Sequence, residues 1–168
     1  MASRLPRCLA TLKSAVQCFP GRVEIRVVCD EESVRLARLC RRFGARFEAI
    51  AQPSVGARGN EVVHRTPSEA LVFPAPRSKL DDHWLTSADN LLSQQHWDAI
   101  LFQPRDSALW PRGFERLWRS TPPPGTLCVH RDWFERIGGF DPALDETAYR
   151  DLVTRLRACQ ARVLELPL

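Results

Sequence analysis

The 168-residue sequence has almost no lysine and no long apolar run. Its basic side chains are nearly all arginine, with lysine only at Lys13 and Lys79. No basic run exceeds Arg41-Arg42, so the net charge of +4 favours dispersed, solvated arginines over a nucleic-acid-binding surface. No segment approaches the roughly 18–20 apolar residues that span a bilayer, and the N-terminus lacks the apolar core of an export signal. We therefore expect a cytoplasmic protein with no integral membrane segment and no nucleic-acid partner.

The sequence also lacks any Cys-x-x-Cys pair, although it contains six cysteines. A zinc site needs closely spaced ligands to form a tetrahedron, so the spacing argues against zinc. Because the cysteines lie inside apolar patterns, we predict buried reduced thiols rather than a disulfide framework or a reactive thiol. The composition, with 44% hydrophobic and 26% charged residues, is typical of a single compact domain over residues 1–168.

Helix and strand patterns alternate along the chain. A strand over 23–28, a helix after Ser33 that ends before Gly44, and a strand over 45–50 together predict a parallel βαβ unit. The alternation predicts a three-layer α/β/α domain with a mostly parallel central sheet and a ligand at the carboxyl ends of its strands. Further helices are predicted over 5–16, 56–65, 81–95, 111–119, 132–137 and 146–159, and further strands over 70–73, 98–102, 126–129 and 162–166.

Four segments carry a resemblance to a known family. They are Glu24-Ile25-Arg26-Val27-Val28-Cys29-Asp30-Glu31-Glu32-Ser33, Gly56-Ala57-Arg58-Gly59-Asn60, the stretch 129–144 with its Ile-Gly-Gly-Phe-Asp core, and the stretch 151–159. In this order, over nearly the whole chain, they resemble the motifs of family 2 glycosyltransferases. The resemblance implies a glycosyltransferase-A fold, which is an α/β domain that binds a nucleotide sugar.

The resemblance also implies three donor-binding residues. Asp30 matches the family's carboxylate that accepts hydrogen bonds from uracil or ribose, although Asp30 and Ser33 would equally suit the start of the following helix. Arg58 matches an arginine that can bind a diphosphate, or it is a solvated helix residue. Asn60 belongs to the same motif and is assigned to substrate binding with them.

The family's metal motif is not retained. Where it has Asp-x-Asp, this sequence has Pro74, Ala75 and Pro76, which offer no side-chain ligand for Mn²⁺ or Mg²⁺. No metal ligand is therefore assigned, and a divalent cation is expected only if nearby carboxylates rescue the site. Asp81, Asp82 and His83 are the nearest candidates, and the two aspartates would also suit a helix start.

The family's acidic base pair is replaced as well, by Ala148 and Tyr149. The acidic residues Asp145 and Glu146 lie three positions earlier, where they would also suit a helix N-terminus. We assign Glu146 and Asp151 as the candidate catalytic bases. The family's first strand precedes the helix that starts here by about Leu5, so we expect part of the donor site to be missing or encoded upstream.

Two functions follow as expectations. The first is a family 2-like glycosyltransferase that transfers a sugar from a nucleotide-sugar donor to an acceptor hydroxyl, in degenerate form. The second is a non-catalytic binding or regulatory partner of an active glycosyltransferase or polysaccharide-synthesis complex. The sequence leaves it open whether the chain is an enzyme. The tryptophans fit core packing better than stacking on sugars.

Overall fold

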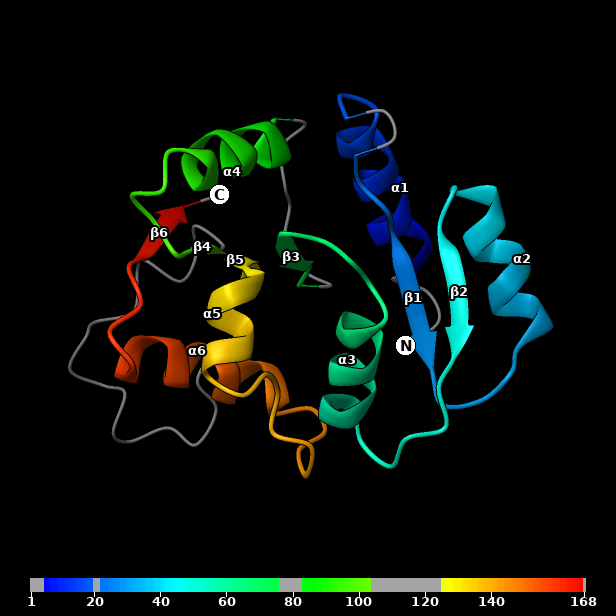
Figure 1. Cartoon of the computed structure of the whole chain (residues 1–168). Coiled ribbons are helices and arrows are strands. Elements are labelled where there is room, and N and C mark those ends of the chain that lie inside the picture. Colours follow the sequence, from blue (N-terminus) through cyan, green and yellow to red (C-terminus); the bar gives the residue numbers. More distant parts are fainter. Residues whose placement is uncertain (1–4, 20–21, 76–82, 104–124, 168) are drawn as a thin grey trace.

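The computed structural model describes residues 5–19, 22–75, 83–103 and 125–167. Figure 1 shows helices and strands alternating along the chain, as the sequence predicts. The described helices are α1 (Leu5–Val16), α2 (Val34–Arg42), α3 (Val55–His64), α4 (Trp84–Ser93), α5 (Arg131–Arg136) and α6 (Ala148–Ala158). The strands are β1 (Arg26–Cys29), β2 (Arg46–Ala49), β3 (Ala70–Phe73), β4 (Ala99–Gln103), β5 (Thr126–His130) and β6 (Val163–Pro167). The helix predicted over 111–119 lies outside the described residues.

The strands form two sheets, which corrects the single, mostly parallel sheet of the prediction. β1 and β2 form a parallel pair, as the βαβ pattern predicts. The second sheet has the order β3-β5-β4-β6, in which β4 and β6 are parallel and β5 is antiparallel to both of its neighbours. This reversal could not be predicted from the pattern, because β4 and β5 are both buried over their first four residues, and a buried strand has the same pattern in either direction.

Helices cover both faces of the four-stranded sheet. Ala99 and Leu101 of β4 face α6, where they pack with Leu152 and Leu156. Alternate residues face α4, where Ile100 and Phe102 pack with Trp84. Because side chains of a strand alternate between the two faces of the sheet, β4 packs against α6 on one face and against α4 on the other. The sheet therefore lies between two helix layers, which is the three-layer arrangement that the sequence predicts.

Helix α1 contributes buried side chains to two separate hydrophobic clusters. Ala15, near its end, packs with Trp84 and Leu85 against the larger sheet. Leu9, one turn and a half earlier, packs with Cys40 and Ala45 against the β1–β2 pair. The helix therefore bridges the two sheets on one face of the molecule.

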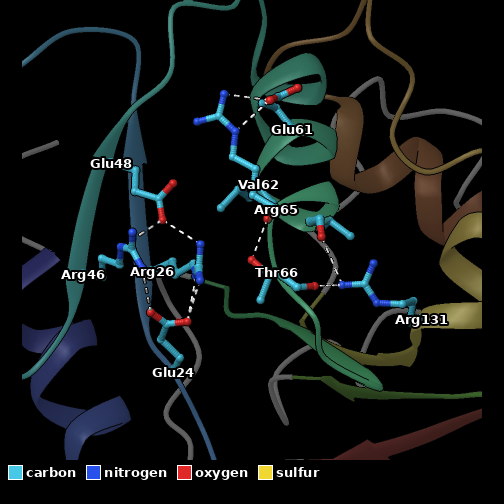
Figure 2. A network of polar contacts seen from close by, with 10 residues as sticks. Glu24, Arg26, Arg46, Glu48, Glu61, Val62, Arg65, Thr66 and Arg131 are labelled. Carbon is cyan, nitrogen blue, oxygen red and sulfur yellow. Dashed lines mark hydrogen bonds and ion pairs between the residues drawn. The ribbon is translucent and has the colours of Figure 1, made fainter.

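The other face of the β1–β2 pair carries charge instead of an apolar layer. Figure 2 shows Arg26 between Glu24 and Glu48, with N–O distances of 2.7 Å to each. Arg46 completes a ring of alternating charges at 3.4 Å from Glu48 and 3.8 Å from Glu24. The side chains of Arg26 and Glu48 are only 14% and 13% exposed. Their ion pair offsets the cost of removing each charge from water.

The cysteines and tryptophans follow the predictions only in part. Cys40 and Cys128 are buried, but Cys18 and Cys159 are exposed, which corrects the expectation that the thiols are buried. Burial raises the pKa of Cys128 to about 12, so this thiol stays protonated and unreactive. Trp84 lies in the core as predicted. Trp110 and Trp118 lie outside the described residues.

Within the described part of the chain, no helix is long and apolar enough to cross a membrane.

A buried aspartate joins the start of β4 to the start of β6. Asp98 is 6% exposed and accepts a hydrogen bond from the Arg162 backbone N–H at 2.7 Å, and one from Nη2 of the same residue at 2.7 Å. This pair was not predicted from the sequence. A signal was available, because Asp98 and Arg162 stand immediately before two apolar strands of equal length.

We expect Asp98→Asn to lower the free energy of unfolding at pH 7 by about 2 kcal/mol, because charge-assisted bonds to a buried carboxylate are lost. The bonds from Arg162 lower the pKa of Asp98, so its contribution is present above the ordinary aspartate pKa and disappears as the pH falls through the folded-state value. Urea denaturation at pH 7 and at pH 3 measures both effects. Asp89→Asn, in an exposed pair with Arg22 at 3.6 Å, should cost under about 0.5 kcal/mol, and equal costs would contradict the assignment.

Candidate functional site

Two of the predicted donor-binding residues lie together at the carboxyl end of β1. Asp30 directly follows the strand, and its Oδ2 lies 3.9 Å from Nη1 of Arg58, in the first turns of α3. The same nitrogen donates a hydrogen bond to the carbonyl of Gln52 at 2.8 Å. The Arg58 side chain is 17% exposed and that of Asp30 is 59% exposed, so the arginine is positioned by protein while the carboxylate faces solvent.

The carboxyl group of Asp30 is held in its ionised form. The Cys29 thiol donates a hydrogen bond to Oδ1 at 3.3 Å, and this bond lowers the pKa of Asp30 together with backbone N–H groups and the charge of Arg58. The capping alternative for Asp30 is wrong, because the side chain of Ser33 caps α2 by accepting the Leu36 N–H at 3.3 Å. Asp30 is thus an ionised acceptor at the strand end.

The start of α3 is docked on a turn from the other end of the chain. The Ser54 hydroxyl accepts the Ala57 N–H at 3.0 Å and donates to the Pro142 carbonyl at 2.5 Å. The carboxylate of Asp145 accepts the Val55 N–H at 2.9 Å. The sequence analysis missed this role of Asp145, since its partner lies 90 residues away. These bonds use the N–H groups at this helix end that a phosphate would otherwise bind, leaving Arg58 as the cationic group.

The third predicted donor residue, Asn60, is bonded to backbone on both sides of its amide. Its Nδ2 donates to the Phe140 carbonyl at 2.8 Å, and its Oδ1 accepts the Phe140 N–H at 2.8 Å. A ligand contact would have to replace one of these bonds. Substrate binding by Asn60 stays a prediction, and the observed geometry is that of a residue that fixes the turn against α3.

The two candidate bases differ in their surroundings. Asp151 accepts a hydrogen bond from Arg155 at 2.7 Å, and that arginine also donates to the carbonyls of Ile137 and Gly139, each at 2.7 Å. Asp151 therefore orients Arg155, which holds the turn that follows α5. Glu146 is exposed, and no hydrogen bond or ion pair of its side chain is found within the described residues.

Core residues occupy the positions where the family has its acidic pair. Ala148 is 1% exposed, and the Tyr149 hydroxyl donates to the Gly125 carbonyl. Burial raises the pKa of Tyr149, so it stays neutral. Neither residue can act as a base at neutral pH.

The described residues do not fit a divalent cation. β3 ends at Phe73, and the next two residues, Pro74 and Ala75, carry no side-chain oxygen or nitrogen. No group of three His, Cys, Asp or Glu side chains in the described part of the chain could hold a metal ion. Pro76, Asp81 and Asp82 lie outside the described residues, while His83 precedes α4 without a side-chain capping bond. We derive no chemical step through a metal.

No protein-family model matches the sequence, and no curated protein matches it either. Several solved structures do match in fold. The mannosyltransferase PcManGT from Pyrobaculum calidifontis, in complex with GDP-Man and Mn²⁺, has a TM-score of 0.66 and 16% identity over 94% of this chain and 50% of that one. Glucosyl-3-phosphoglycerate synthase from Mycobacterium tuberculosis has a TM-score of 0.66 and 14% identity over 95% and 65%.

A third similar structure is S. aureus TarS in complex with UDP, with a TM-score of 0.64 and 17% identity over 94% of this chain and 52% of that one. This chain has a glycosyltransferase-A-like fold. It spans between half and two thirds of the length of these three proteins. At such identities the likeness establishes the glycosyltransferase-A-like architecture, and the activity has to be argued from the site.

We expect Asn60→Ala to destabilise the protein by about 2 kcal/mol, because two hydrogen bonds are lost and the Phe140 backbone is left unpaired, while alanine's better helix propensity offsets a part. Urea denaturation followed by circular dichroism measures the change. His64→Ala, an exposed position on the same helix, should change stability by less than about 0.5 kcal/mol. A cost for Asn60→Ala as small as that of the control would contradict the scaffolding role.

Proposed function

We propose that this chain is a glycosyltransferase-like domain that binds a nucleotide sugar, or its nucleotide, and does not itself transfer the sugar. The observation that carries the proposal is the pairing of Asp30 with Arg58 at the end of β1. The two described residues after β3, Pro74 and Ala75, offer no side-chain ligand for a cation. This pair supplies the charges that nucleotide binding would need, whereas of the two candidate bases Asp151 is bonded to Arg155 and Glu146 alone is exposed without a bonded partner among the described residues.

The two charged side chains supply complementary contacts. The ionised carboxylate of Asp30 is suited to accept hydrogen bonds from a ribose hydroxyl or a base N–H. The guanidinium of Arg58 still has N–H groups beyond the one bound to Gln52, and a planar fork of donors suits a diphosphate. Two of the similar solved structures are complexes with GDP-Man and with UDP, which supports a nucleotide as the probe to use here.

Transfer needs more than binding. A departing diphosphate must be neutralised, and the acceptor hydroxyl must lose its proton to a base within hydrogen-bond reach. Within the described part of the chain, Arg58 is the one cation paired with Asp30. Asp145 caps α3, and Asp151 is paired with Arg155. We therefore propose a binding or regulatory role beside an active glycosyltransferase or polysaccharide-synthesis complex, in a reducing cytoplasm where the six free cysteines persist.

A working transferase is the second candidate, and the exposed carboxylate of Glu146 is the observation that favours it. In that case Glu146 would remove the acceptor proton. Hydrolysis and transfer assays with UDP-, GDP- and dTDP-sugars, with and without Mn²⁺ or Mg²⁺, separate the two candidates. The proposal predicts no turnover above that of Glu146→Gln, and turnover lost in that variant would establish the enzyme instead.

We expect UDP, GDP or a corresponding nucleotide sugar to raise the melting temperature. A ligand at 100 times its Kd adds about 2.7 kcal/mol, which corresponds to a shift of about 5–10 °C for a protein of this size. Arg58→Gln should weaken binding about tenfold or more, measured by calorimetric titration, because a charge-assisted contact to phosphate is removed.

Arg65→Gln is the matched control, since Arg65 lies at the other end of α3 in an exposed pair with Glu61. Its affinity should stay within about twofold of wild type. Equal losses in the two variants would show a general charge effect instead of a site. No shift with any nucleotide or nucleotide sugar would overturn the proposed function.

A further inference from the structure

An open groove lies beside the start of α1, along the outer side of α2. It has a volume of about 600 Å³. Its apolar lining residues, which we call the floor, are Pro6, Val34, Leu36 and Leu39. Val34 is 70% exposed, whereas the other three are half-buried. Exposed apolar surface within a concave site is the part of a protein surface that gains most from being covered.

The rim of the groove is basic. Arg35, Arg38 and Arg42 line it, and all three are exposed. They stand at positions i, i+3 and i+7 of α2, so they form one stripe along the helix. The helix contains no acidic residue between Val34 and Arg42.

Within the described residues these three arginines have no carboxylate partner, whereas nine other arginines do. Elsewhere arginines are paired with Asp or Glu, at Arg22, Arg26, Arg46, Arg58, Arg65, Arg131, Arg155, Arg157 and Arg162. Across residues 5–19, 22–75, 83–103 and 125–167, no ion pair involves Arg35, Arg38 or Arg42. Among the described residues the fold thus pairs nine arginines with carboxylates and leaves a cluster of positive charge around an apolar floor.

We infer that this groove is the docking site for an acidic amphipathic helix of a partner protein. Helix α2 has nine residues and is about 13.5 Å long, which matches two to three turns of a partner helix. Apolar side chains at i, i+3 or i+4, and i+7 of that helix would cover the floor, and flanking Glu or Asp residues would meet the arginine stripe. The inference does not rest on nucleotide binding at Asp30 and Arg58.

The shape and charge argue against other occupants. A flat anionic membrane would meet the arginines of the rim but would leave the floor between them hydrated. A second copy of the same groove would bring two basic stripes together, which repel each other. An acidic amphipathic helix would bury the apolar floor and pair its carboxylates with the arginines of the rim.

The test uses the full chain and a defined probe. The probe is a fluorescein-labelled synthetic peptide of about 18 residues, with leucines at i, i+3, i+4 and i+7 spacing and glutamates on both flanks. A peptide of the same composition in scrambled order is its control. We expect saturable binding of the amphipathic peptide by fluorescence anisotropy, at least tenfold tighter than the scrambled one and weaker at high salt.

Two variants locate the site. The double variant Arg35→Glu/Arg38→Glu should weaken peptide binding at least tenfold, and Val34→Ser should weaken it about threefold. Arg41→Glu is the matched control on the same helix, because Arg41 is exposed but does not line the groove, and it should weaken binding less than threefold. Circular dichroism melting checks that every variant is folded.

Three results would overturn the inference. They are absence of binding by the amphipathic peptide, equal binding of the scrambled peptide, and an effect of Arg41→Glu as large as that of Arg35→Glu/Arg38→Glu. Binding of single-stranded RNA or of phosphatidylserine vesicles at this groove, with no binding of the peptide, would assign it to a different class of partner and would also overturn it.

Discussion

The docking of α3 on the turn between α5 and α6 fixes the positions of the other groups at the candidate site. The turn approaches the helix so closely that a Cβ at Gly59 would lie 2.7 Å from the Phe140 ring, and one at Gly56 would lie 2.1 Å from the Asp141 carbonyl oxygen. The paired bonds between Asn60 and Phe140 then fix the register of the contact. Because α3 is held in this way, Arg58 emerges from it beside Asp30 at the end of β1.

The fold could be predicted from the sequence further than the site could. Periodicity located the described helices and strands to within a few residues, since apolar spacing depends on local geometry. The order of local motifs indicated the glycosyltransferase-A-like architecture that the solved neighbours confirm. The antiparallel direction of β5 was not predictable in this way, because the direction of a buried strand is decided by contacts far away in the chain.

The roles of particular polar residues were harder to predict for a related reason. Asp145 and Asp151 are acidic residues near a helix start, and local sequence cannot show that one caps a helix 90 residues away while the other holds Arg155. The residues that carry the resemblance, such as Asn60 and the Gly138-Gly139-Phe140 turn, build the interlocking contact with α3. In this chain those motif residues make packing contacts, so likeness of motif indicates the fold, while the activity has to be argued from the site.

Amide hydrogen exchange, measured with and without saturating UDP or GDP, tests most directly whether the end of β1 and the start of α3 form a nucleotide site. Our structure predicts slower exchange on nucleotide binding in the peptides that cover residues 29–33 and 55–60, since Asp30 and Arg58 lie there. It predicts little change in α5, which packs against β5 and contributes no residue to the Asp30–Arg58 pair. Unchanged exchange at 29–33 and 55–60 in the presence of a nucleotide that demonstrably binds would contradict this placement of the site.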